Sequence, residues 1–135
     1  MAGFALPVRV YLEDTDAQGV VYNASFFRFM ERARTELLRS LGIDHDELRA
    51  HHGIALVLTG ISASFRAPGR LSDLLYVGAD VAEVRGARVV FEQSVRRGAA
   101  DGELLCEGQA EVACMDLDRG RPKRLPEELM RELSR

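Results

Sequence analysis

The sequence predicts an α+β fold in which a curved antiparallel sheet wraps around one long central helix. Three observations support this fold class. A stretch near the N-terminus has the spacing of an amphipathic helix, the second half of the chain alternates with the period of β-strands, and short glycine-containing turns separate those strands. Strands joined by short turns run antiparallel, and a long apolar helix face needs a surface to cover it, so we expect the sheet to enclose the helix.

The first expected elements are a strand over residues 7–11, a loop of small and acidic residues through Gly19, and the long helix. Asn23 or Ser25 can cap this helix, and Gly42 should end it. Its apolar face follows helical spacing and consists of Phe26, Met30, Ala33, Leu37 and Leu41. Its opposite, polar face should carry Arg28, Glu31, Arg32, Arg34 and Glu36.

A second helix should begin at Asp44, because this acidic cap and Glu47 three residues later resemble a capping box, and it should end near Gly53. Alternating apolar residues then predict a meander of four strands over residues 55–65, 74–84, 88–96 and 103–115. Turns are expected at residues 67–69, 85–87 and 97–102, and a closing helix at residues 126–133.

Length and composition indicate one globular domain over residues 1–135. The chain is 47% hydrophobic and 29% charged, which suits a single buried core and not a disordered protein. A formal net charge of −3 lacks the basic excess of a nucleic-acid-binding domain. No apolar run approaches the roughly 20 residues that cross a bilayer, and residues 1–7 lack the features of a secretory signal. We therefore expect a cytoplasmic protein with no nucleic-acid partner and no transmembrane segment.

The cysteines and histidines are expected to be structural or solvated. Cys106 and Cys114 would lie about 26 Å apart on one continuous strand, too far for a disulfide, and should be small buried hydrophobes. The adjacent residues His51 and His52 do not share a helical face for metal binding, and His45 lies beside the same short helix.

The densest group of acidic, polar and glycine residues lies at residues 13–23, just before the long helix. On an extended backbone, Asp14 and Asp16 would point the same way. The following helix N-terminus presents unpaired N–H groups and the positive end of the helix dipole. A carboxylate facing such amides suits addition to a carbonyl, since the carboxylate attacks or activates water while the amides stabilise the oxygen. Gly19 would let the backbone approach a ligand closely.

Two other interpretations of this segment stay open from the residues alone. One is an acidic loop in which a single aspartate caps a turn. The other is a metal site formed by Glu13, Asp14 and Asp16, although the segment lacks the spacing and the ligating glutamate of a calcium loop. The sequence contains no GxSxG, HExxH, Walker or Rossmann pattern.

Three segments form a longer pattern. Residues 8–25 read VRVYLEDTDAQGVVYNAS, residues 31–36 read ERARTE, and residues 66–73 read RAPGRLSD. Together they resemble the hotdog-fold acyl-CoA thioesterases, and among these the Tol-Pal-associated, YbgC-like group akin to 4-hydroxybenzoyl-CoA thioesterase. The third segment is similar to that family's x-A-P-A-R-L-x-D turn. The resemblance runs from Pro7 to Pro122 and implies a hotdog fold.

The resemblance also implies an activity, namely hydrolysis of the thioester of an acyl-CoA or acyl-carrier-protein substrate. Its catalytic aspartate falls on Asp16, acting as nucleophile or as general base for water, and the backbone N–H of Asn23 would polarise the carbonyl. Many relatives carry histidine where this chain has Asn23, so a backbone donor is retained but a histidine side chain is not. The implied substrate-binding residues are Gly19, Val20, Tyr22, Arg85 and Arg88. No cofactor is expected apart from CoA as part of the substrate, and no metal.

The resemblance further implies a homodimer or homotetramer, because hotdog sites generally lie between subunits, and pairing would cover an exposed sheet edge. Residues 56–64 and the long helix would set the depth of the acyl pocket. The alternative function is a protein of the same fold that binds acyl-CoA or acyl carrier protein without turnover, or that serves as an envelope-associated interaction protein.

Overall fold

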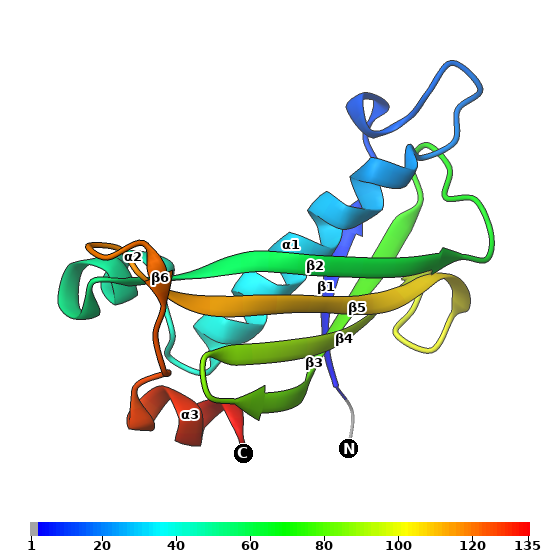
Figure 1. The fold of residues 1–135 in the computed structure, drawn as a ribbon. Helices are drawn as coiled ribbons and strands as arrows, with labels where there is room; N and C mark the ends of the chain where they lie inside the picture. Colours follow the sequence, from blue (N-terminus) through cyan, green and yellow to red (C-terminus); the bar gives the residue numbers. More distant parts are fainter. Residues whose placement is uncertain (1–2) are drawn as a thin grey trace.

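The computed structural model describes residues 3–135 and confirms the α+β architecture, with a curled sheet around helix α1 (Figure 1). In chain order the elements are β1 (Phe4–Arg9), the 3₁₀ turn η1 (Leu12–Asp14), α1 (Asn23–Ser40), α2 (His45–Glu47), the π-helical turn η2 (Leu48–His52), β2 (Ile54–Phe65), β3 (Leu74–Arg85), β4 (Arg88–Arg97), β5 (Glu103–Asp116), β6 (Arg121–Pro122) and α3 (Glu127–Leu133).

Local sequence signals account for most of these boundaries. Asp44 caps α2 as expected, since its Oδ1 accepts hydrogen bonds from the backbone N–H of Asp46 at 2.9 Å and of Glu47 at 3.4 Å. Gly42 follows the end of α1 with a φ of +80°, the left-handed conformation that glycine adopts readily. The sequence did not reveal η1 or the two-residue strand β6.

The predicted meander is wrong at one step. The strand order is β1-β3-β4-β5-β2, with β6 beside β5, and all pairs are antiparallel. β2 therefore pairs with β5, and residues 66–73 carry the chain from β2 across to β3 near the other edge. A flat hairpin between β2 and β3 would leave α1 uncovered on one side, whereas this crossing lets the sheet close around the helix.

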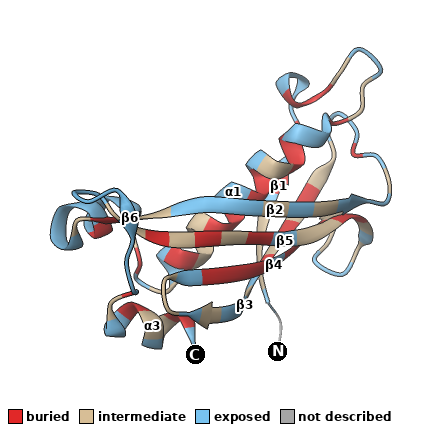
Figure 2. Cartoon of the chain, viewed as in Figure 1, coloured by how far each residue is buried: buried red, intermediate tan, exposed pale blue. Residues whose placement is uncertain are grey.

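The interior on the helix side of the sheet contains two groups of buried side chains, one on each half of α1. Cys106 belongs to the first group and Cys114 to the second, and both are unpaired, as predicted. Burial raises the pKa of the Cys106 thiol to about 11. Figure 2 shows that the middle of the sheet is buried while β2, at its edge, is largely exposed.

One residue of α1 lies on a different face from the one predicted. Arg34 was expected on the polar face, but it is buried with only 7% exposure. It follows Met30 by one turn, so helical spacing places it at the margin of the apolar stripe, beneath β4.

Over residues 3–135, no helix is both long enough and apolar enough to cross a bilayer.

Candidate active site

The segment between β1 and α1 forms a tight loop beyond one end of the sheet (Figure 1). Thr15 and Val21 form an antiparallel bridge that closes this loop. Inside it, the N–H of Asp16 donates to Val20 O at 2.9 Å, and the N–H of Gly19 donates to Asp16 O at 3.0 Å. Gly19 has a φ of +79°, which a residue with a Cβ rarely adopts, so the turn itself requires glycine here. The backbone on either side of Asp16 is therefore fixed.

The Asp16 carboxylate is half-buried and uses only one of its oxygens within the chain. Oδ1 accepts hydrogen bonds from the backbone N–H of Gln18 at 2.8 Å and of Val20 at 3.3 Å. Oδ2 has no hydrogen-bond partner among residues 3–135. The same side chain thus caps a turn and leaves one oxygen open for chemistry.

Asp14 has a different role from Asp16. It is buried, and its Oδ2 accepts from the backbone N–H of Tyr11 at 2.8 Å while its Oδ1 accepts from Arg28 at 3.2 Å. Its backbone oxygen also accepts from the N–H of Tyr22 at 3.0 Å. The extended backbone that would have aimed Asp14 and Asp16 together is interrupted by η1. Asp14 consequently fastens the loop to α1 rather than facing a ligand.

Helix α1 begins at Asn23 without a side-chain cap. The N–H of Ser25 donates to Tyr22 O at 2.9 Å, but within the described part of the chain no acceptor is found for the N–H of Asn23 or of Ala24. Tyr22, Asn23 and Ala24 are exposed. Open N–H groups at a helix N-terminus can stabilise a carbonyl oxygen that gains negative charge.

The crossing segment 66–73 supports this loop from the side. The N–H of Val21 donates to Gly69 O at 2.8 Å, and the N–H of Leu71 donates to Gly19 O at 3.2 Å. Gly69 is buried, and an added Cβ would lie 2.9 Å from a Val21 methyl, so a residue with a Cβ here would have to displace the Val21 side chain. Two motifs that the sequence showed separately are therefore one structural unit.

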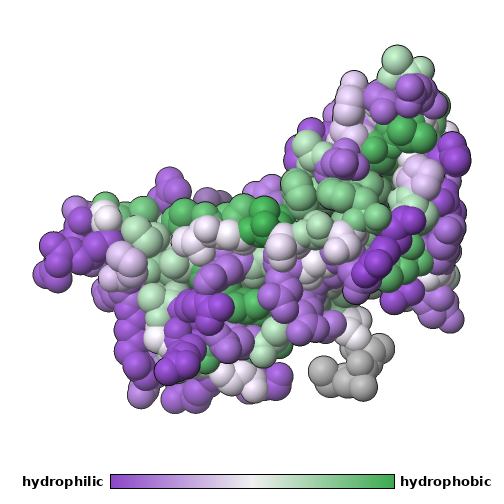
Figure 3. Space-filling view, turned by 45° about the vertical axis from the view of Figure 1, so that its right-hand side comes forward, coloured by the Kyte–Doolittle hydropathy of each residue, from purple (hydrophilic) through white to green (hydrophobic). Residues whose placement is uncertain are grey.

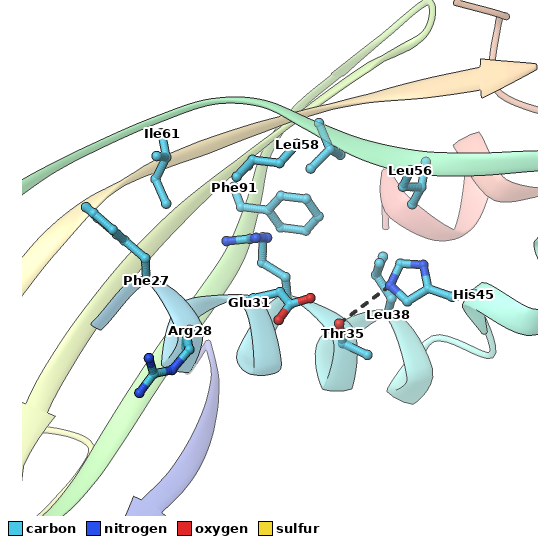
Figure 4. A pocket seen from close by; sticks show the side chains of 12 residues that line it. Phe27, Arg28, Glu31, Thr35, Leu38, His45, Leu56, Leu58, Ile61 and Phe91 are labelled. Atoms are coloured by element: carbon cyan, nitrogen blue, oxygen red, sulfur yellow. Dashed lines mark hydrogen bonds between the residues drawn. The ribbon is translucent and has the colours of Figure 1, made fainter. Parts of the chain in front are cut away.

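A second site component is a cavity of about 390 Å³ between α1 and β2 (Figure 4). It begins at Phe27, one helical turn after Asn23, and extends along the helix toward His45, whose Nε2 lies 3.5 Å from Thr35 Oγ1. Its walls are mainly apolar: Phe27, Leu38, Leu56, Leu58, Ile61, Phe91 and Val112. Residues of the segment 56–64 and of the long helix, which were expected to set the depth of the acyl pocket, line this cavity. His45 was expected to be structural or solvated, and its place in the lining was not predicted.

Arg85 and Arg88 lie at the turn between β3 and β4, near α3 and far from the Asp16 loop within one chain (Figure 1). The Arg88 side chain is paired with Glu83 and Glu111, and its hydrogen bond to Glu111 raises its pKa. Their contact with substrate stays a prediction. Arg70, which the sequence did not single out, forms a bridge with Val20 beside the Asp16 loop.

Residues 3–135 contain no group of three or more His, Cys, Asp or Glu side chains that could hold a metal ion. The carboxylate groups of Asp14 and Asp16 have the separate hydrogen-bond partners described above.

Comparison with known proteins shows the family to which the chain belongs. Residues 10–133 match the thioesterase-like superfamily. The chain is 42% identical over 127 residues to the acyl-CoA thioesterase YbgC of Haemophilus influenzae, a match that covers 94% of this chain and 91% of that protein. It is 40% identical over 129 residues to the acyl-CoA thioester hydrolase YbgC of Escherichia coli O6:H1, covering 96% and 94%.

Among solved structures, Slr0204, a 1,4-dihydroxy-2-naphthoyl-CoA thioesterase from Synechocystis, resembles the chain with a TM-score of 0.88 at 25% identity, covering 97% of this chain and 95% of that one. The chain therefore belongs to the thioesterase-like superfamily, and the hotdog fold implied by its motifs is confirmed. It is an enzyme that hydrolyses thioesters.

Proposed function

We propose that the chain hydrolyses acyl-CoA thioesters with the carboxylate of Asp16 and the backbone N–H of Asn23. The observation that carries this proposal is the open Oδ2 of Asp16, on a fixed loop that leads directly into an uncapped helix. The relatives named as acyl-CoA thioesterases support the choice of CoA as the thiol. Acyl carrier protein is the alternative carrier of the same acyl group.

Two chemical routes use these groups. In the first, Asp16 takes a proton from water as the water oxygen attacks the carbonyl carbon, the C–S bond breaks, and the sulfur leaves as a thiol after gaining the proton. In the second, Oδ2 attacks the carbonyl carbon and expels the thiolate, and water then hydrolyses the mixed anhydride. In both routes the N–H of Asn23 donates to the carbonyl oxygen while that oxygen carries negative charge.

The cavity between α1 and β2 is the proposed acyl site. Its volume of about 390 Å³ lies within the range of roughly 300–1,000 Å³ usual for small-molecule sites, and its apolar walls suit a hydrocarbon chain. Gly19, Val20 and Tyr22 would then contact the substrate near the thioester, and Arg85 and Arg88 would contact the CoA phosphates. No metal or other cofactor is part of the proposal.

We also propose a homodimer or homotetramer in which Asp16 of one copy faces Asn23 of another. β2 is an edge strand that exposes Val57 and Leu58, and Figure 3 shows apolar surface along the body and up the lobe formed by the start of α1. Pairing of two β2 edges would cover such a surface. Sedimentation tests this point, since an active monomer would contradict it.

We further propose a cytoplasmic location, which the two unpaired thiols of Cys106 and Cys114 support.

The decisive experiment is a thiol-release assay with acyl-CoA substrates of graded chain length. We expect Asp16→Asn to lower kcat by about 10²–10⁴-fold, the usual contribution of a general base. Glu13→Gln is the matched control, because Glu13 is an exposed carboxylate in the same loop and should keep its activity. If wild type releases CoA from no substrate but binds acyl-CoA, the protein is a binding module. If Asp16→Asn stays fully active, only the assignment of the site fails.

A further inference from the structure

A buried arginine lies in the wall of the cavity between α1 and β2. Arg34 is 7% exposed, and its Nη1 donates to Gln93 Oε1 at 2.9 Å. Gln93 is itself 5% exposed and is held in turn, because its Nε2 donates to Met30 O at 2.9 Å. The guanidinium is therefore positioned by a short network from β4 and α1.

No carboxylate neutralises Arg34. Over residues 3–135 it forms no salt bridge, and Gln93 is its one hydrogen-bond partner. Burial lowers the pKa of Arg34, whereas the nearby charge of Glu31 raises it. Among residues 3–135, every fully buried side-chain nitrogen and oxygen has a hydrogen-bond partner, so the other two guanidinium nitrogens of Arg34, which have none, are not fully buried. Since Arg34 lines the cavity, they open into it.

The other ionisable side chains of the cavity wall are either paired elsewhere or exposed, and none of them forms a salt bridge with Arg34. Arg28 is paired with Asp14 at 3.2 Å, Glu31 is exposed, and His45 is exposed beside Thr35. Arg34 is thus a largely buried cation in a cavity with mainly apolar walls. A buried charge is costly when it is only partly hydrogen-bonded, and an oxygen acceptor that reached the open nitrogens would offset that cost.

The position of Arg34 along the helix sets where such an oxygen would be. Arg34 lies eleven residues after Asn23, which corresponds to about 16 Å at about 1.5 Å per residue. Helical side chains point back toward the N-terminus, and an arginine spans about 6 Å. Measured along the helix axis, the guanidinium is then about 10 Å from the level of the Asn23 amide, roughly the length of an extended acyl chain of about eight carbons.

We propose that Arg34 makes the enzyme selective for acyl groups that carry an oxygen acceptor at their far end, roughly eight carbons from the thioester. This inference rests on the proposed function, because it takes the cavity as the acyl site. The shared chemistry is a hydrogen-bond-accepting oxygen, which a terminal hydroxyl or a terminal carboxylate can supply. A plain fatty acyl chain of the same length would leave the open nitrogens of Arg34 without a partner.

The test compares octanoyl-CoA, 8-hydroxyoctanoyl-CoA and octanedioyl-CoA, which differ only at the far end. In wild type, kcat/KM should be higher for both oxygen-terminated substrates than for octanoyl-CoA. We call the kcat/KM of an oxygen-terminated substrate divided by that of octanoyl-CoA the selectivity ratio. Arg34→Met should lower this ratio by about 10–100-fold, as expected for the loss of hydrogen bonds to a charged group. If Arg34→Met lowers the ratio more for octanedioyl-CoA than for 8-hydroxyoctanoyl-CoA, charge is the main cause of the selectivity. If it lowers both ratios equally, hydrogen bonding is the main cause. An unchanged ratio would overturn the proposal.

Two further variants separate selectivity from folding. The double variant Arg34→Met with Gln93→Met removes both polar side chains of the pair, so neither is left buried without its partner. If Arg34→Met alone is unstable, the selectivity ratio is measured on this double variant. Arg32→Met is the matched control, because Arg32 is exposed on the same helix outside the cavity and should leave the ratio unchanged.

Calorimetry with the product acids distinguishes this inference from the proposed function. Octanedioate should bind wild type more tightly than octanoate, and Arg34→Met should abolish the difference. If wild type releases no CoA but shows this difference, the proposed function fails and the inference stands. If the two acids bind alike, or neither binds, the inference is refuted even if the enzyme is active.

Discussion

Replacing Asp14 with alanine should destabilise the active-site loop although Asp14 does not face the substrate. The buried carboxylate joins the N–H of Tyr11 at 2.8 Å to the Arg28 side chain at 3.2 Å. Alanine leaves the Tyr11 N–H without its acceptor and removes the anion opposite Arg28. The loop that holds Asp16 would then lose its attachment to α1.

The expected loss of unfolding free energy in Asp14→Ala follows from these two contacts. A hydrogen bond to a charged group contributes about 1.5–3 kcal/mol when it is shielded, which applies to the Tyr11 N–H. The Arg28 side chain is 53% exposed, so solvent screening reduces its ion pair to about 0.5 kcal/mol. The sum is about 2–3.5 kcal/mol. With an unfolding entropy of about 2.1 cal/mol/K per residue over 135 residues, Tm should fall by about 7–12 °C.

Thermal unfolding followed by circular dichroism measures this change, with Glu13→Ala as the exposed control in the same loop. Asp14→Asn should lose less than Asp14→Ala, because the amide oxygen can still accept from Tyr11. Thioesterase activity should fall with Asp14→Ala at temperatures where the protein is folded, since Asp16 is no longer held in place. A Tm shift below about 2 °C would refute this account of Asp14.

Two further predictions concern Arg97 and the cysteines. Arg97 donates to Pro68 O at 2.9 Å and pairs with Asp73 and Glu103, so Arg97→Met should loosen the crossing segment. The free energy of unfolding, measured by chemical denaturation, should fall by about 1–2 kcal/mol, and kcat/KM should also fall. Burial raises the pKa of both thiols, that of Cys106 to about 11, so little thiolate forms at pH 8. Native protein should resist alkylation at this pH, whereas protein unfolded in urea should react at both Cys106 and Cys114, as mass spectrometry can show.

The elements of the fold could be predicted from the sequence because their signals are local. The apolar stripe of α1, the cap at Asp44 and the alternation of the four long strands each depend on neighbouring residues. The partner of β2 could not be predicted in this way. It depends on whether residues 66–73 turn back or cross the sheet, and both paths satisfy the same local pattern.

The site was predictable to a similar extent. The loop was identified by its position before a long helix and by the motif around Asp16. The different roles of Asp14, which holds the loop, and of Asp16, which keeps one oxygen open, depend on η1, and the sequence did not reveal this turn. Arg34 was misplaced because charge alone assigned it to the polar face. Its spacing of four residues from Met30 was the signal that could have placed it in the interior.

The crossing of residues 66–73 has a consequence for the order in which the enzyme becomes competent. The Asp16 loop is held by Gly69 and Leu71, and that segment takes its place only when β2 has reached β5 and β3 has reached β4. The β2–β5 pairing joins residues far apart in the sequence, and such contacts form slowly during folding. A partly folded chain with α1 already helical would therefore have no assembled site, so recovery of activity should report the last stage of refolding.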